Sequence, residues 1–285
     1  MKVPPEMSGV VRIAFVGNEL QFCTDSALVA EAATFVFRHH LSPPVDDPSQ
    51  TVDVVADGDG FRFVANGQVV AIAMNLAELP VTLMQVGQQR LIFKETTHAM
   101  LHAAVLVKDG CGLLLPAVAG SGKTTLTAWL LGHGYGLLSD ELAAVGQGDV
   151  IDGLTRPLNI KPGSRLLVDG FDWLGGALAR SRLSSGVTLV PWDRHRAEKL
   201  LAAAIVCPCY EANAAFSVER LSHGLCAKAL MGSLLNARNL PKHGLAFANR
   251  FAGARPGYRI RYSNLADVTA WLEQQEFANS SLSQA

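Results

Sequence analysis

The sequence lacks any long hydrophobic run and any excess of one charge. Its 285 residues carry 24 Lys and Arg against 25 Asp and Glu, which leaves a net charge of −1. This balance creates no basic field to attract nucleic acid or an anionic membrane surface, and we expect neither as a partner. The richest apolar run, residues 200–206, is about seven residues long, whereas a membrane-spanning helix needs ~18. The composition indicates a soluble protein.

The start of the chain and its cysteines point to the cytoplasm. The first six residues, MKVPPE, contain one lysine, two prolines and an acid, without the apolar block of a secretory signal. The five cysteines are scattered and lack the paired C-x-x-C units of a zinc ribbon. We expect reduced thiols in a cytoplasmic protein, with Cys207-Pro208-Cys209 as an alternative surface pair for a metal or redox role.

A hydrophobic fraction of 49% in a chain of this length is enough to form one large core or two smaller ones. In the first part of the chain, apolar spacing predicts a helix over 27–37. Alternating residues over 51–74, interrupted by the turn Asn66-Gly67, predict an antiparallel meander. A long helix is expected over 76–100. These elements predict a smaller N-terminal α+β domain over residues 1–95, with substrate recognition as a hypothesis for its role.

The rest of the chain, residues 96–285, mixes strand and helix patterns and predicts an α/β domain. Two apolar segments on either side of a turn predict a hairpin, and its second strand, 113–116, runs into a glycine-rich loop. Further strands are expected over 202–206, 216–219 and 258–262, and helices over 222–235 and 265–275.

The glycine-rich loop has the pattern of a phosphate-binding loop. Residues 117–124, AVAGSGKT, match G-x-x-x-x-G-K-[ST] at every fixed position except the first, where Ala117 replaces glycine. A strand pattern before the loop and a helical pattern after it would aim backbone N–H groups and the positive end of a helix at one anion. Lys123 supplies charge to the β- and γ-phosphates, and the Thr124 hydroxyl can bind Mg²⁺. An ordinary glycine turn before a helix is the alternative. The predicted nucleotide-binding residues are Gly120, Ser121, Gly122, Lys123, Thr124 and Thr125, and the expected ligands are ATP, or another nucleoside triphosphate, and Mg²⁺.

An acidic pair follows at a suitable distance from this loop. The apolar segment 135–139 ends in Asp140-Glu141, and a right-handed crossover would return it parallel to strand 113–116. Both strands would then end at the same edge of the sheet, with the acidic pair beside the γ-phosphate and its metal. Successive residues of a strand point to opposite sides, so one carboxylate would face the metal and the other a substrate hydroxyl or a partner cation. A solvated acidic pair at the end of a strand is the alternative.

Together these residues resemble the catalytic core of HPr kinase/phosphorylase. The resemblance rests on the loop Gly120-Ser121-Gly122-Lys123-Thr124, on Asp140, which lies 17 residues after the lysine, and on His102, which lies 21 residues before it. The sequence is most similar to the smaller HPr-kinase-like enzymes, some of which phosphorylate a serine of lasso-peptide precursors. The resemblance covers roughly residues 98–165. Taken alone, His102 is also compatible with a hydrogen-bonded histidine of a strand.

The resemblance implies a PEP-carboxykinase-like nucleotide-binding fold for residues 96–285. It implies that Asp140 is the base that takes the proton from a serine hydroxyl, that Glu141 stands where the family often has a second Asp, and that His102 lies near the transferred phosphoryl group. Thr124, Glu141 and Asp140 would then hold Mg²⁺. The implied partner is a protein or peptide that bears a serine, such as a biosynthetic precursor peptide, and the family also implies a homo-oligomer.

Two cations follow the acidic pair, in the segment 155–163. Phosphoryl transfer spreads negative charge over the equatorial oxygens, and Arg156 and Lys161 are candidates to stabilise that charge. Ordinary surface cations are the alternative. A second basic cluster, Arg194-His195-Arg196 with Lys199, fits either an acidic or phosphorylated substrate or a solvated face.

Three functional hypotheses remain. The chain departs from the family at Ala117 and Glu141 and lacks a recognisable dephosphorylation signature, so no phosphorylase activity is expected. The Asn-Lys-x-Asp motif of Ras-like GTPases is absent, as are the His-Arg-Asp and Asp-Phe-Gly motifs of protein kinases. The leading hypothesis is a Mg²⁺-dependent kinase that phosphorylates a serine of a protein or peptide. The alternatives are a kinase of a small-molecule alcohol and a nucleotide-binding regulatory module with little turnover. Asp140 favours an enzyme, because a nucleotide sensor needs no base beside the acceptor.

Overall fold

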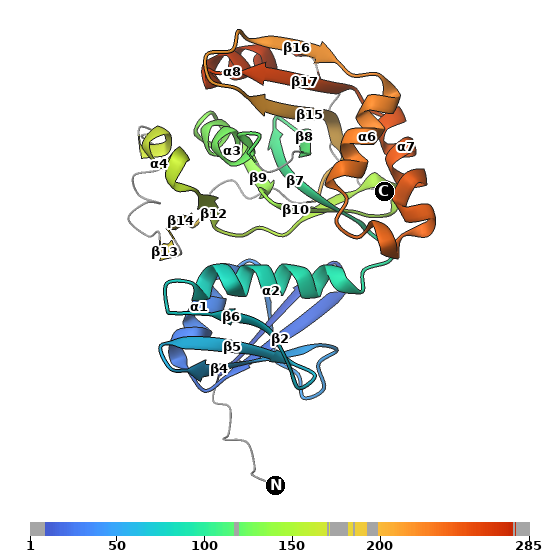
Figure 1. Cartoon of the computed structure of the whole chain (residues 1–285). Coiled ribbons are helices and arrows are strands. Elements are labelled where there is room, and N and C mark those ends of the chain that lie inside the picture. Colours follow the sequence, from blue (N-terminus) through green and yellow to red (C-terminus); the bar gives the residue numbers. More distant parts are fainter. Residues whose placement is uncertain are drawn as a thin grey trace. The chain divides into compact units, whose positions relative to one another are not determined.

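The computed structural model describes residues 9–116, 120–169, 171, 182–184, 186–192, 199–275 and 277. The chain is a mixed α/β protein that divides into two compact units (Figure 1). Unit 1 comprises Met1–Lys94 and Arg182–Leu189, and unit 2 comprises Glu95–Ser181 and Val190–Ala285. The sequence-based division after residue 95 assigns 182–189 to the second domain, whereas these residues belong to unit 1 in the structure.

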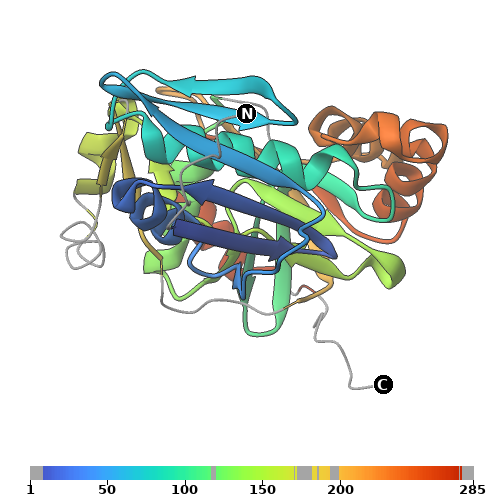
Figure 2. The same cartoon turned by 90° about the horizontal axis from the view of Figure 1, so that it is seen from below.

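Unit 1 contains a six-stranded sheet with the strand order β3-β1-β2-β4-β5-β6. Neighbouring strands are antiparallel except β2 and β4, which are parallel. Figure 2 shows the hairpin of β1 and β2 in dark blue. The strands are β1 (Gly9–Phe15), β2 (Asn18–Thr24), β3 (Leu41–Ser42), β4 (Thr51–Asp57), β5 (Gly60–Ala65) and β6 (Gln68–Ala73), and the helices are α1 (Ala27–Phe37) and α2 (Leu79–Phe93).

Helix α1 coincides with the predicted helix over 27–37 and packs against α2. Phe37, the last residue of α1, is fully buried, and its ring stacks on Phe22 of β2 with 5.9 Å between the centroids. Gly87 of α2 leaves room for this ring, because a Cβ there would overlap it. The predicted turn at Asn66-Gly67 joins β5 to β6, and its residues have φ values of +51° and +73°.

A hairpin from the second half of the sequence attaches to α2 of unit 1. Its strands are β13 (Arg182–Ser184) and β14 (Val187–Val190). The Ser184 hydroxyl donates to the carbonyl of Ala77 at 2.5 Å and accepts from the N–H of Val81 at 3.4 Å. These two bonds explain why a segment so distant in sequence belongs to unit 1.

The helix predicted over 76–100 is shorter in the structure. Helix α2 ends at Phe93, and a strand begins at Ala99. Between them, the Glu95 carboxylate accepts hydrogen bonds from the N–H groups of Thr97 and His98, both at 2.7 Å. This side-chain-to-backbone turn leads the chain out of the helix, so the apolar residues after it form a strand.

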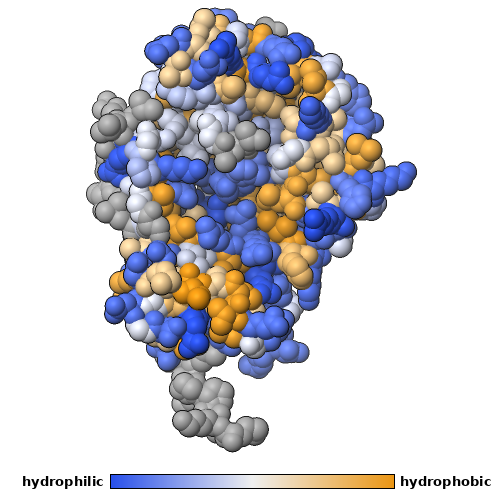
Figure 3. All heavy atoms as spheres, in the orientation of Figure 1, coloured by the Kyte–Doolittle hydropathy of each residue, from blue (hydrophilic) through white to orange (hydrophobic). Residues whose placement is uncertain are grey.

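Strand β6 lies at the edge of the unit 1 sheet and carries exposed apolar side chains. It contains no charged residue and no proline, the features that usually protect such an edge. The exposed hydrophobic residues in and just after β6 are Val69, Val70, Ile72 and Met74. Figure 3 shows hydrophobic residues gathered over this part of unit 1. The edge is therefore apolar and unprotected by charge.

Unit 2 is built on a larger sheet with the order β11-β10-β7-β8-β15-β17-β16, and β9 also pairs with β7. Strands β8, β15 and β17 are mutually parallel, and β7 is antiparallel to β8. The strands are β7 (Ala99–Lys108), β8 (Cys111–Pro116), β9 (Gly136–Ser139), β10 (Leu142–Val145), β11 (Ile151–Gly153), β12 (Leu158–Ile160), β15 (Ala202–Tyr210), β16 (Ser217–Arg220) and β17 (Gly257–Tyr262). The helices are α3 (Lys123–Gly132), α4 (Pro162–Asp169), α6 (His223–Ser233), α7 (Leu245–Gly253) and α8 (Leu265–Glu273), and none in the described part of the chain has the length and hydrophobicity to span a bilayer.

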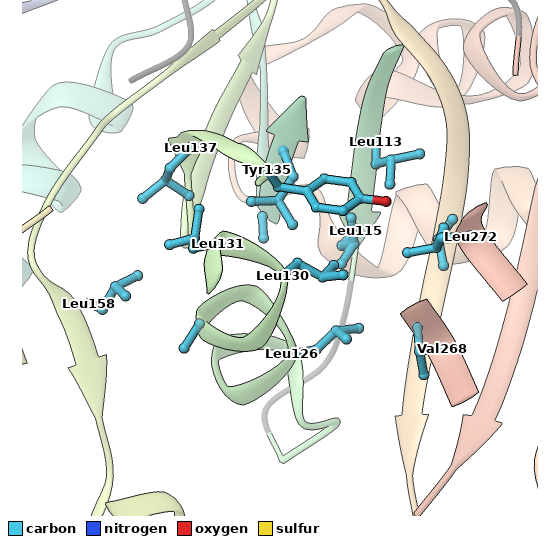
Figure 4. Packing of buried hydrophobic residues seen from close by; sticks show 14 of the residues in the cluster. Leu113, Leu115, Leu126, Leu130, Leu131, Tyr135, Leu137, Leu158, Val268 and Leu272 are labelled. Carbon is cyan, nitrogen blue, oxygen red and sulfur yellow. The ribbon is translucent and has the colours of Figure 1, made fainter. Parts of the chain in front are cut away.

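Helix α3 is held over the sheet by a leucine-rich core. Figure 4 shows Leu126 and Leu130 of α3 in one cluster with Leu115 of β8 and Val268 of α8. All four side chains are essentially inaccessible to solvent. Because this core fixes α3 against both β8 and α8, the loop that joins β8 to α3 begins and ends on rigid elements.

The relation between β8 and β9 differs from the prediction in one respect. Both strands pair with β7 in the antiparallel sense, so they run parallel to each other, but β7 lies between them and they are not neighbours. On β7, His102 is opposite Leu142 on one side, and Ala103 is opposite Pro116 on the other. Strand β7 therefore places His102 between the end of β8 and the acidic pair that follows β9.

Candidate functional site

The phosphate-loop residues lie where β8 gives way to α3. Gly122 precedes the first residue of the helix with φ +85°, and Gly120 has φ +86°. Both values lie in the left-handed region, which glycine occupies without a steric penalty. Leu126 N–H donates to the Gly122 carbonyl at 2.9 Å and begins the α3 ladder. Ala117, the departure from the loop pattern, lies outside the described residues.

Strands β15 and β17 hold the loop from one side. A Cβ on Gly122 would come within 2.7 Å of the Tyr262 hydroxyl and 2.8 Å of Tyr210 Cβ. The Tyr210 N–H donates to the Ser121 carbonyl at 3.0 Å. Gly122 is therefore required twice, by its positive φ and by the close approach of two tyrosines.

Lys123 joins the loop to the acidic pair. Its side chain is 6% exposed, its ammonium group donates to the backbone carbonyl of Asp140, and Nζ lies 3.5 Å from Glu141 Oε2. The structure thus brings the lysine and the acidic pair together, as their spacing in the sequence predicts. It does so although β7 lies between β8, which precedes the loop, and β9, which precedes the acidic pair. A buried ammonium needs such partners, because its desolvation would otherwise be costly.

Glu141 also contacts His102. His102 Nε2 lies 2.8 Å from Glu141 Oε1, and the Ala103 N–H donates to the Glu141 carbonyl at 3.2 Å. Burial by itself would raise the pKa of the Glu141 carboxyl. The hydrogen bond from His102 and the charges of Lys123 and Arg156 outweigh that effect and lower this pKa well below its usual range. Glu141 is therefore an anion held between two cationic or hydrogen-bonding groups.

Asp140 is in the opposite situation. Its side chain is 1% exposed, and Oδ1 has no hydrogen-bond partner among the described residues. Burial, followed by the charge of Glu141, raises the pKa of the Asp140 carboxyl to about 6. Arg156, 4% exposed and also without a partner at Nε in the described part of the chain, contributes an opposing positive charge.

A cavity of about 730 Å³ opens beside these residues. It brings together the loop residues, His102, Glu141 and Lys161, whereas neither Asp140 nor Arg156 lines it. The sequence prediction places Asp140 at the acceptor hydroxyl, but in the structure the carboxylate that faces the cavity is that of Glu141. The lining residues are His102, Gly120, Ser121, Gly122, Lys123, Thr124, Thr125, Trp129, Glu141, Asn159, Ile160, Lys161, Gly163, Ser164, Phe171, Tyr210, Tyr262, Ser263, Asn264 and Leu265.

The residues present fit a magnesium ion that arrives with a nucleotide. No group of three or more His, Cys, Asp or Glu side chains in the described part of the chain forms a complete metal site. Mg²⁺ bound to nucleotides rarely needs one, since it keeps several waters and takes one or two protein ligands plus phosphate oxygens. Thr124 and Glu141 line the cavity and carry such oxygens. Asp140 does not line it, and its buried Oδ1 has no hydrogen-bond partner among the described residues.

Lys199 of the second basic cluster and the five cysteines do not line this cavity. Lys199 Nζ lies 3.1 Å from Asp152 Oδ2, and Arg194, His195 and Arg196 lie outside the described residues. Cys207 and Cys209 are free thiols, and neither belongs to a metal-binding group among the described residues.

One wall of the cavity has no signal in the sequence. Tyr210 ends β15 and Tyr262 ends β17, and Ser263 and Asn264 follow β17, all far from the phosphate loop in sequence. Only the parallel pairing of β15 with β8, and of β17 with β15, identifies them as cavity residues. Neither the protein-family models nor the curated proteins include a match to this chain, so its function is argued from the site itself.

Proposed function

We propose that this protein is a Mg²⁺-dependent kinase that transfers the γ-phosphoryl group of a nucleoside triphosphate to a serine hydroxyl of a protein or peptide. The observation that carries the proposal is the meeting of Lys123, Glu141 and His102 at the mouth of a glycine loop, inside one cavity. A nucleotide-binding module without turnover would need the lysine and the loop, but not a carboxylate hydrogen-bonded to a histidine beside them.

The phosphate cradle is supported by the backbone of the loop. The glycines expose N–H groups at the N-terminus of α3, where the helix dipole favours negative charge. Lys123 adds a full positive charge at the same place. In this proposal Lys123 exchanges its contact with Glu141 for one with the incoming triphosphate. Unit 2 is then a PEP-carboxykinase-like nucleotide-binding domain.

We assign the metal to Thr124 and Asp140. A bound Mg²⁺ neutralises charge on the β- and γ-phosphates and orients them for in-line attack. The raised pKa of Asp140 fits this role, because Oδ1 of this buried carboxylate has no hydrogen-bond partner among the described residues and a nearby cation would stabilise its charged form.

We assign the acceptance of the serine proton to Glu141 and His102 instead of Asp140. Both side chains line the cavity and are hydrogen-bonded to each other, so the carboxylate orients the imidazole toward a substrate hydroxyl. Lys161 lines the cavity as well and is placed to neutralise charge on the transferred phosphoryl group. Arg156 is buried and its charge acts on both Asp140 and Glu141, so in this proposal it acts through the carboxylates instead of through the phosphate.

The acceptor class rests on the resemblance to HPr-kinase-like enzymes. The proposed setting is the cytoplasm, and the proposed substrate is a serine-bearing protein or precursor peptide. Phosphoryl transfer to it would be an in-line displacement in which the serine oxygen forms a bond to Pγ, the bond from Pγ to the β–γ bridging oxygen breaks, and the serine proton passes to the Glu141–His102 pair.

The test is a transfer assay with a panel of acceptors. The protein would be incubated with Mg²⁺ and ATP in the presence of serine peptides, free serine or sugars, and the acceptors would be examined by mass spectrometry for one added phosphate. Phosphorylation of a peptide serine that is lost in Lys123→Ala would support the proposal. Phosphorylation of free serine or a sugar alone would establish a small-molecule kinase, and nucleotide binding without transfer to any acceptor would contradict an enzyme.

A further inference from the structure

The cavity has two chemically different ends. At one end lie His102, Lys123 and Glu141, which are ionisable and interact with one another. At the other lie uncharged residues that end or follow β15 and β17: Tyr210, Tyr262, Ser263, Asn264 and Leu265. The topology explains the separation, because β7 and β9 lie on one side of β8 and β15 and β17 lie on the other.

This arrangement gives a bound nucleoside triphosphate a direction. If the γ-phosphate is transferred at the charged end, it lies near Lys123 and Glu141, and the chain of phosphates crosses the loop at the N-terminus of α3. The nucleoside then points toward the carboxyl ends of β15 and β17, which are parallel to β8 and end at the same edge of the sheet.

Tyr210 provides an aromatic surface at that end. Tyr210 is 44% exposed and lines the cavity, so its ring is accessible to a ligand there. The backbone N–H of Tyr210 donates to the Ser121 carbonyl at 3.0 Å, which fixes the residue relative to the phosphate loop. Its ring meets that of Tyr262 edge to face, with 5.8 Å between the centroids, so the two rings do not stack on each other.

Asn264 provides a hydrogen-bond donor beside it. The Asn264 side-chain oxygen accepts from the N–H of Ala266 at 3.0 Å and caps helix α8. That bond orients the amide, and its NH₂ group donates to no other group among the described residues. The neighbouring Ser263 hydroxyl is already engaged, since it donates to the carbonyl of Ala214 at 2.8 Å.

We propose that Tyr210 and Asn264 form a nucleobase subsite, in which the base of the nucleoside triphosphate stacks on the Tyr210 ring and accepts a hydrogen bond from the Asn264 amide. This inference rests on the proposed function, because it requires the phosphates in the loop. Stacking on an aromatic side chain tolerates different bases, since each has a π-face. The subsite therefore supplies affinity for a nucleoside triphosphate over an inorganic polyphosphate.

The test compares ATP with inorganic tripolyphosphate, which carries the phosphates without a nucleoside. Affinities of both for the full-length protein would be measured by calorimetry in the presence of Mg²⁺. We expect Tyr210→Ala to weaken ATP binding roughly tenfold, within about 5- to 150-fold, and to leave tripolyphosphate binding unchanged. Tyr210→Phe keeps the ring and is the matched control, with an expected change below about threefold.

Asn264→Asp isolates the second contact. The aspartate keeps an oxygen to cap α8 but removes the amide donor, so the ratio of ATP to tripolyphosphate affinity should fall. An ATP affinity that Tyr210→Ala leaves unchanged would overturn the subsite while the phosphate site stands. Equal losses for ATP and tripolyphosphate would also overturn it, because the ring would then act only through the loop. If the wild-type protein bound neither ligand, the proposed function itself would fail.

Discussion

His102 Nε2 lies 2.8 Å from Glu141 Oε1, and this contact joins the central strand β7 to the segment that follows β9. Glu141 Oε2 lies at the same time 3.5 Å from Lys123 Nζ, so one carboxylate connects the phosphate loop to the histidine. The arrangement depends on the position of β7 between β8 and β9. His102 on β7 pairs with Leu142, and the next residue, Ala103, pairs with Pro116 at the end of β8. In the proposed function, transfer of the γ-phosphoryl group would therefore involve this carboxylate.

We expect Glu141→Gln and His102→Gln to abolish most of the transfer activity and to leave nucleotide binding largely intact. Removal of a positioned proton acceptor typically lowers turnover by about 10²–10⁴-fold. Because the two side chains act as a unit, the double variant should lose little more than either single variant. The measurement is kcat for peptide phosphorylation, with the affinity for ATP as the binding control.

Asp140→Asn distinguishes the two assignments of the acidic pair. With Asp140 as a metal ligand, the variant should need a higher Mg²⁺ concentration for half-maximal activity and recover part of its turnover when Mg²⁺ is raised. If instead Asp140→Asn lost transfer at every Mg²⁺ concentration while Glu141→Gln retained it, Asp140 would be the base that the sequence resemblance implies, and the Glu141–His102 assignment would be wrong.

The same two acids should have opposite effects on stability at neutral pH. The pKa of Asp140 is raised from its usual 3.8 to about 6. Between these two pH values the folded protein keeps a proton on Asp140 that the unfolded chain has already released. Its charged form therefore destabilises the fold, fully above about pH 6 and not at all below about pH 4. Asp140→Asn should increase the free energy of unfolding at pH 7.5 by about 1–3 kcal/mol, with no increase near pH 4.

Glu141 provides the matched comparison. Its pKa is lowered from the usual 4.5, so its charged form stabilises the fold above that pH and the contribution is lost as the pH falls through the lowered value. Glu141→Gln should then decrease the free energy of unfolding at pH 7.5, by about 1–3 kcal/mol. Denaturant unfolding of both variants across pH 4–8 tests the pair, and a destabilised Asp140→Asn at neutral pH would contradict the assigned direction.

Two glycines of the loop should respond differently to alanine. Gly120 and Gly122 have nearly the same φ, so each substitution pays about 1–2 kcal/mol for the left-handed backbone. At Gly122 the new Cβ also meets Tyr262 and Tyr210 below 3.0 Å, whereas at Gly120 nothing lies within 4 Å. Gly122→Ala should therefore lower the melting temperature more than Gly120→Ala. Equal shifts would mean that the tyrosines move aside at little cost.

Much of the site could be predicted because its signals are local. A strand, a glycine loop and a helix with Lys123 at its start are contiguous, and the positive φ that the loop needs is visible as glycine at 120 and 122. Only one crossover connection, through helix α3, separates this loop from Asp140-Glu141. The prediction did not identify β7 as the strand between them, because pairing is determined by the whole sheet and not by the segments that it joins.

For a related reason, the sequence could not predict which of the two acids faces the cavity. Alternation predicts that Asp140 and Glu141 point to opposite sides, but it does not say which side is the cavity. Packing decides it, since the side chain of Asp140 is buried and that of Glu141 reaches His102. Tyr210 and Asn264 were missed because they come from strands whose parallel register with β8 is a long-range property.

A buried asparagine that no motif marks should be important for the stability of unit 2. Asn236 is buried, accepts from the N–H of Met100 at 2.9 Å, and donates to the carbonyls of Glu95 and His98 at 3.0 and 2.9 Å. Asn236→Ala removes all three bonds and deprives the Met100 N–H and the His98 carbonyl of the buried amide, so it should lower the free energy of unfolding by about 2–4 kcal/mol. Asn239, which is less buried and donates to the same Glu95 carbonyl at 3.2 Å, is the control, with an expected loss for Asn239→Ala below about 1 kcal/mol. Denaturant unfolding measures both, and equal losses would show that burial of the amide does not set its contribution.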